Sequence, residues 1–117
     1  AHRKMIRLNQ VTLWVMKASR LLDARHLKEA EPWMHKARKV MDQVSVMGDQ
    51  GHKDLHRDIL AMVLALEGNY ELMRGEWSKA ADYFLESYRT APNHPLAKAR
   101  KVVGERLKRQ RSRISSP

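Results

Sequence analysis

Apolar residues recur every three or four positions along most of this chain, which is the spacing that places them on one face of an α-helix. Residues 4–23 carry one such stripe, and a second begins at Leu27 after the short break at residues 23–26. Pro32 sits early enough in the second stretch that its missing N–H and its clash with residue 28 affect the first turn, where proline is tolerated. The pattern therefore predicts two antiparallel helices. Their apolar positions are Met5, Leu8, Val11, Thr12, Val15, Ala18 and Leu22, then Leu27, Ala30, Met34, Ala37, Met41 and Val44.

The middle of the chain contains two glycines, Gly48 and Gly51, which predict a turn over residues 47–52. Apolar periodicity continues on both sides of this turn. We therefore expect both inner helices to be prolonged by about two turns each, so that residues 40–62 form an elongated antiparallel hairpin. The charged residues near its tip leave a second interpretation open, in which residues 45–58 are a flexible insertion.

Residues 67–92 contain the clearest local signals in the chain. A tight turn at residues 74–76 contains a glycine, which supplies the turn conformation, and Pro92 ends the helix that follows. Within that helix, the small side chain of Ala80 lets two helices approach closely, and Phe84 lies four residues further along the same side. This stretch predicts two short antiparallel helices.

A last helix is predicted over residues 95–112, followed by a frayed tail over residues 113–117. We expect its apolar stripe to cover the end of the fold and its basic face to point to solvent. The stripe consists of Leu96, Ala99, Val102, Val103 and Leu107.

The spacing of these residues resembles the tetratricopeptide repeat (TPR), a helical hairpin with a spaced W, LG, Y, A, F and P signature. The resemblance implies an all-α fold of TPR-like antiparallel hairpins, stacked as a short solenoid of about five helices. It divides one domain, residues 1–117, into a first repeat over residues 11–44, a second over residues 61–94 and a capping helix over residues 95–112. The signature positions are Trp14, Ala18, Leu21, Ala30, Met34 and Ala37 in the first repeat, and Gly68, Trp77, Ala80, Phe84 and Pro92 in the second.

Both repeats depart from the signature. Lys17 and Asp42 occupy the leucine and proline positions of the first, and the two repeats match each other at a separation of 50 residues where the family has 34. In the second repeat Gly68 fits, but Glu67 and Glu71 occupy apolar positions. We favour a register shifted by one residue, with a turn one residue longer, because it buries apolar residues instead. Those residues are Val63, Leu66 and Tyr70.

The resemblance implies a scaffold or adaptor that binds a protein segment on a concave face lined by the first helix of each hairpin. Met side chains there suit an adaptable peptide groove, although the same residues could equally be ordinary core. Two repeats are fewer than the three that usually give a stable array, so we also expect self-association or membership in a larger protein. The predicted partner-binding residues are Thr12, Val15, Met16, Ser19, Leu22, Met62, Ala65, Asn69 and Leu72.

The net charge of +10 is concentrated at the two ends of the chain. Residues 1–20 hold five Lys or Arg and no acid, and residues 98–117 hold eight against one Glu, whereas the middle is slightly acidic. Basic ends of this kind contact nucleic acid or another anionic surface, or serve only to keep a helix solvated. The alternative function is therefore a regulatory module of a transcriptional or nucleic-acid-associated protein. The candidate phosphate-binding residues are Lys98, Lys101, Arg106, Lys108 and Arg109.

Catalytic and metal-binding patterns are weak. The chain has no cysteine, which excludes disulfides and thiolate metal sites. His52 and His56 have the i, i+4 spacing of a zinc chelate, but Lys53 stands where a metalloprotease has glutamate, so two solvated histidines are the favoured interpretation. No phosphate-binding glycine loop or activated nucleophile is evident, and no apolar run approaches the ~20 residues of a membrane span. We therefore expect a cytoplasmic, non-enzymatic protein without cofactor or metal.

Overall fold

The chain folds as an all-α protein, shown in a computed structural model that describes residues 2–44 and 49–115, with the side chains of residues 7–44 and 49–110. These residues form five helices and no strand, which confirms the predicted fold class. The helices are α1 (His2–Asp23), α2 (Leu27–Gln43), α3 (Gln50–Met73), α4 (Trp77–Thr90) and α5 (Ala97–Ser115).

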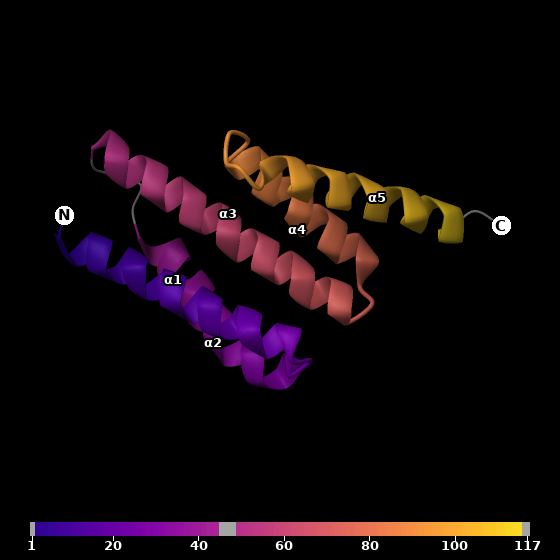
Figure 1. Cartoon of the computed structure of the whole chain (residues 1–117), viewed down its shortest axis with the longest axis horizontal. Coiled ribbons are helices and arrows are strands. Elements are labelled where there is room, and N and C mark those ends of the chain that lie inside the picture. The colour runs from indigo at the N-terminus through magenta and orange to yellow at the C-terminus, as the bar shows by residue number, and fades with distance from the viewer. Residues whose placement is uncertain (1, 45–48, 116–117) are drawn as a thin grey trace.

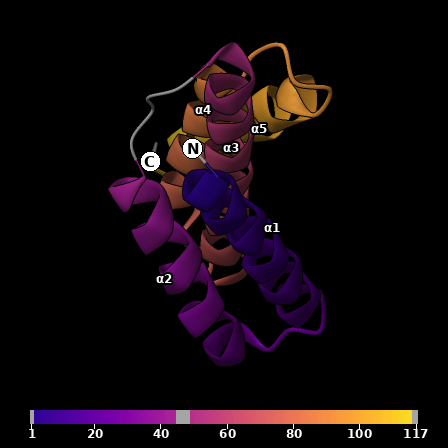
Figure 2. The same cartoon turned by 90° about the vertical axis from the view of Figure 1, so that its left-hand side faces the viewer.

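The helices are arranged in two layers (Figures 1 and 2). α1 packs against α2 and α3 against α4, each pair joined by a short turn, so that both pairs are antiparallel hairpins. α3 also packs against α1 and α2, which joins the hairpins, and α5 packs on α4. Figure 2 shows α1 and α5 on one side of α3 and α2 and α4 on the other.

The two hairpins have the same turn. Arg25 and Gly75, which are 50 residues apart, both have a positive φ, of 66° and 80°. In the first turn the N–H of His26 donates to the carbonyl of Leu21 at 2.8 Å, and in the second the N–H of Glu76 donates to that of Glu71 at 2.9 Å. This bonding closes the C-terminus of a helix around a left-handed residue. The 50-residue match predicted from the sequence is thus confirmed in the backbone.

Small side chains hold each hairpin together at close range. Ala30 and Ala80 are fully buried at equivalent positions of α2 and α4. Gly68 of α3 lies directly against Phe84, because a Cβ at this glycine would be 3.1 Å from the ring. The hydroxyl of Ser87 donates to the carbonyl of Ala61 at 2.5 Å in the same contact. The expected close approach at Ala80 and Phe84 is confirmed.

The register that we favoured for α3 is wrong at the contact with α4. Gly68, in the unshifted register, meets Phe84, and the turn is no longer than that of the first hairpin. Val63 and Leu66 are buried too, but in the core shared with α1 and α2. α3 is the central helix and buries two faces. The unshifted register describes its contact with α4 through Gly68, and the residues of the shifted register, Val63 and Leu66, pack against α1 and α2.

Of the two helices of the predicted elongated inner hairpin, only α3 is prolonged. α2 ends at Gln43 and Val44 has extended backbone (φ −78°, ψ 121°), so the predicted prolongation of this helix is wrong. α3 begins at Gln50, where the carboxylate of Asp49 accepts from the N–H of His52 at 2.8 Å. Residues 50–58 are helical, so they are neither a turn nor a flexible insertion. The parts of these predictions that concern residues 45–48 lie outside the described residues.

α5 buries a different face from the one predicted. Leu107 of the predicted stripe is buried as expected, together with Ala97, Arg100 and Gly104. The other residues of the stripe are exposed: Leu96, Ala99, Val102 and Val103. The reason is Gly104, where a Cβ would be 2.8 Å from Leu85 Cγ and 3.3 Å from the carbonyl oxygen of Ala81, so the glycine sets how closely α5 lies on α4. The helix starts two residues later than predicted and includes residues 113–115 of the expected tail.

Candidate protein-binding surfaces

The nine residues predicted to line a partner groove do not form one surface. Val15 and Leu22 are buried in the core that α1 and α2 share with α3, so they are not accessible to a partner. Met16 is 47% exposed, and Asn69 is exposed as well. The others are half-buried: Thr12, Ser19, Met62, Ala65 and Leu72.

α5 adds two exposed apolar residues to this side of the molecule. Leu96 is 55% exposed and Val103 is 37% exposed. Each stands four residues before a buried residue on the α3 side of α5, namely Arg100, which is near Asp58, and Leu107, which packs in one cluster with α3 side chains. A spacing of four residues keeps Val103 and Leu107 on the same side of the helix. Leu96 directly precedes the helix, and its carbonyl accepts from the N–H of Arg100 at 3.1 Å.

We call this surface the front face. It is formed by α1 and α5, which lie on the same side of α3 (Figure 2), and by the side of α3 between them. The prediction missed its α5 part because it assigned those apolar residues to the core. The spacing of the small residues Ala97 and Gly104, seven apart, was the signal that could have identified the buried side. The front face consists of Thr12, Met16, Ser19, Met62, Ala65, Asn69, Leu72, Leu96, Ala99 and Val103.

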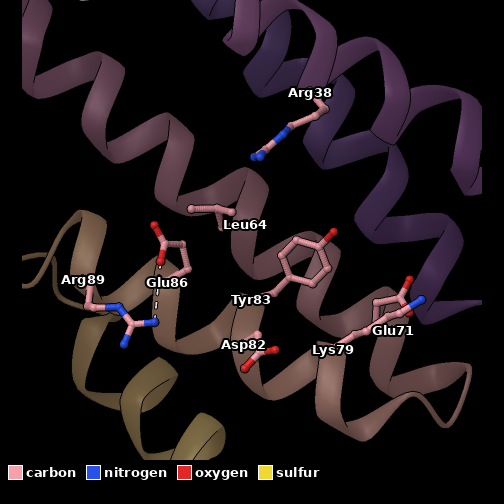
Figure 3. A pocket seen from close by; sticks show the side chains of 8 residues that line it. All are labelled: Arg38, Leu64, Glu71, Lys79, Asp82, Tyr83, Glu86 and Arg89. Atoms are coloured by element: carbon pink, nitrogen blue, oxygen red, sulfur yellow. Dashed lines mark ion pairs between the residues drawn. The ribbon is translucent and has the colours of Figure 1, made fainter.

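The opposite layer contains a cleft of about 620 Å³ between α2 and α4, over α3. Figure 3 shows Arg38 of α2 facing Tyr83 and Leu64 across it. Arg38 Nη1 lies 3.3 Å from Glu67 Oε1 of α3. Burial raises the pKa of Glu67, which Arg38 opposes, and burial together with Glu67 and Glu71 raises the pKa of Tyr83. The other charged side chains that line the cleft are three acids and two bases: Glu71, Asp82 and Glu86, and Lys79 and Arg89.

Polar contacts tie α2 to α3 beside this cleft. The hydroxyl of Tyr70 donates to the carboxylate of Glu31, and burial and this carboxylate raise the pKa of Tyr70 to about 12. Together with Arg38 and Glu67, this contact joins the two hairpins at two points. These groups are paired with each other, so their arrangement fixes the two hairpins relative to one another.

The two histidines of α3 are buried, so the prediction of solvated side chains is wrong. Neither Nε2 atom of His52 and His56 has a hydrogen-bond partner among the described residues. Burial lowers the pKa of His56, which a hydrogen bond to the backbone of Val44 opposes and the nearby His52 reinforces. No group of three or more His, Cys, Asp or Glu able to hold a metal occurs in residues 2–44 and 49–115.

The basic residues predicted to bind phosphate are brought together on α5. All five are exposed, and none forms an ion pair with a described residue. Lys101 is held in place, since its Nζ lies 5.2 Å from the centre of the Tyr88 ring of α4. These residues are Lys98, Lys101, Arg106, Lys108 and Arg109.

Comparisons of the chain with family models, with curated proteins and with solved structures gave no match. Among the helices that the structure describes, none combines the length and apolar character needed to cross a membrane.

Proposed function

We propose that this protein is a non-enzymatic scaffold or adaptor whose front face binds a segment of a protein partner. The proposal rests on one observation: Met16 of α1, Leu96 directly before α5 and Val103 of α5 are large apolar side chains that are exposed to solvent. Isolated exposed apolar residues need no explanation, but several of them on both helices that flank α3 favour an interaction site. The repeated turn and close contacts support the TPR-like reading of the fold, as a short stack of hairpins with a binding face.

The chemistry of the front face favours an acidic, amphipathic segment. Arg106 follows Val103 by three residues and Arg20 follows Met16 by four. An exposed guanidinium therefore lies beside Val103 and another beside Met16. Apolar anchors of a partner helix would pack on the exposed side chains while its carboxylates pair with the two arginines. Met62 of α3 is half-buried, and its flexible side chain can adapt to the shape of a bound segment.

Self-association through the same surface is less favourable. A second copy would bring its own Arg20 and Arg106 against the same surface of the first, and like charges across an interface oppose binding. Sedimentation of the purified chain at micromolar concentration distinguishes a partner segment from a second copy. If the chain forms a stable dimer that is lost when Val103 is substituted, the front face binds a second copy and not a partner segment.

Two neighbouring valines of α5 give a matched test. Val103 lies on the front face, whereas Val102, 42% exposed, points away from it. A photo-crosslinking residue placed at 103 should capture a protein in the source cell, and one at 102 should not. A peptide from the captured protein should then bind the purified chain at least about tenfold more weakly after Val103→Asp, because a charge in an apolar contact is costly.

The matching Val102→Asp variant should bind that peptide as the unmodified chain does, with the same helical circular dichroism for all three proteins. Equal capture at both positions, or peptide binding that Val103→Asp leaves intact, would remove the front face as the site.

A further inference from the structure

The outer side of α5 is a cationic surface that borders the front face at Arg106. Lys98, Lys101, Glu105 and Lys108 follow one another at helical spacing, with Arg109 beside the last, and Glu105 is the only acid among them. This side is opposite to Val103. We call these four basic residues and the neighbouring Arg106 the α5 basic row.

The charge of this row is not compensated within the described chain. Four other arginines form ion pairs with carboxylates: Arg38, Arg57, Arg74 and Arg89. None of the α5 basic row does so, and Arg100 adds a buried positive charge on the same helix. Burial lowers the pKa of Arg100 and Asp58 of α3 opposes this. The positive potential along the row is therefore open to an external anion.

We propose that the α5 basic row binds the phosphates of duplex nucleic acid without reading its sequence. Lys98 and Arg109 are eleven residues apart, which is about 16 Å along a helix at ~1.5 Å per residue. A duplex carries about one phosphate charge per 1.7 Å of its axis, so several phosphates lie within reach of the row. Val102, between the bases, is small enough for the helix to approach the backbone closely.

The side chains of the row favour a duplex over the other polyanions. Single-strand binders stack bases on aromatic rings, but α5 has no aromatic residue, and the nearby ring of Tyr88 is occupied by Lys101. Helices that lie in a membrane surface present a wide apolar face with Trp, Phe or Leu, whereas Val102 is the only apolar residue among these bases. Phosphate contacts need neither feature.

Counterion release sets the size of the expected effect. Five phosphate contacts give a slope of about −4.5 for log affinity against log salt, at roughly −0.9 per contact. Between 50 and 200 mM salt the affinity should then fall roughly 500-fold.

The test is fluorescence anisotropy of the full chain with a labelled 20-base-pair duplex of mixed sequence. The triple variant Lys98→Gln, Lys108→Gln, Arg109→Gln should weaken binding at least about tenfold and flatten the salt slope by nearly 3. The control triple Lys28→Gln, Lys39→Gln, Lys53→Gln removes the same charge from exposed positions of α2 and α3 and should change binding less than about threefold. Glutamine is a good helix former, so both should keep the fold.

Three outcomes would overturn the proposal: binding that does not depend on salt, equal weakening by both triples, or binding to vesicles containing anionic phosphatidylserine but not to the duplex. The result is independent of the protein-binding proposal, because Val103→Asp lies on the front face and removes no base of the α5 basic row.

Discussion

Buried histidines are the least expected residues of this chain. His52 and His56 are buried side chains of α3, and His56 has a hydrogen bond with the backbone of Val44 directly after α2. Their spacing alone favoured a solvated pair at a helix start. Sequence could not show that α3 begins before them and carries them into the interior, since the same i, i+4 pattern fits an exposed and a buried face equally well.

The burial of His56 predicts a loss of stability in acid. Its pKa is below 6.5 in the folded protein, so below about pH 6.5 the unfolded chain binds the proton first, and the free energy of unfolding falls as the pH drops. The slope for one proton is at most about 1.4 kcal/mol per pH unit. Denaturant unfolding at pH 7.5 and 5.5 measures this loss in the free energy of unfolding.

The control for this experiment is a second histidine. Glu67 has a raised pKa and acts in the opposite direction, so the comparison must be between variants rather than between pH values. His56→Gln should reduce the loss between pH 7.5 and 5.5, while His35→Gln, at an exposed position, should leave it unchanged. An identical loss in both variants would show that another group causes it.

At the scale of elements, the contact between α4 and α5 depends on Gly104. Gly104→Ala would place a methyl group 2.8 Å from Leu85 Cγ, so we expect a loss of about 1–2 kcal/mol in the free energy of unfolding, despite the better helix propensity of alanine. Gly51→Ala is the matched control. Its nearest neighbour would be Asp49 Oδ1 at an ordinary 3.5 Å, so it should be neutral or stabilising by up to about 1 kcal/mol. Equal effects would contradict the close contact.

Sequence periodicity predicted the helices well where the local chemistry was strong. The turns at residues 23–26 and 74–76 were correctly placed, because a left-handed residue between amphipathic stretches leaves little choice. It failed for α5, whose apolar residues lie on a different side from its contacts. A glycine and an arginine are both poor markers of burial, yet Gly104 gives the closest approach and Arg100 is buried near Asp58.

The residues of the candidate site were also predicted correctly in part and wrongly in part. Met16 and Asn69 were correctly expected to be accessible, whereas Val15 and Leu22 are core. A helix wheel of α1 cannot separate these outcomes, since it shows which residues share a side and not where α3 will lie against it. Leu96 and Val103 were missed for the same reason.

At the scale of the whole molecule, two equivalent hairpins and α5 give the protein two faces with different chemistry. The front face combines exposed apolar side chains with arginines, and the outer side of α5 is almost purely basic. Both proposals depend on how α5 is rotated against α4. If α5 were turned to bury Leu96 and Val103, the front face would lose its exposed apolar row and the basic residues would move with it.

Cysteine scanning of α5 measures this rotation directly, because the chain has no cysteine of its own. Single cysteines at Leu96 and Val103 should react with a maleimide as fast as a free thiol. Cysteines at Ala97 and Leu107 should react at least about tenfold more slowly, since they open to solvent only with local unfolding. The reverse order, with 96 and 103 protected and 97 reactive, would contradict the arrangement on which both binding surfaces rest.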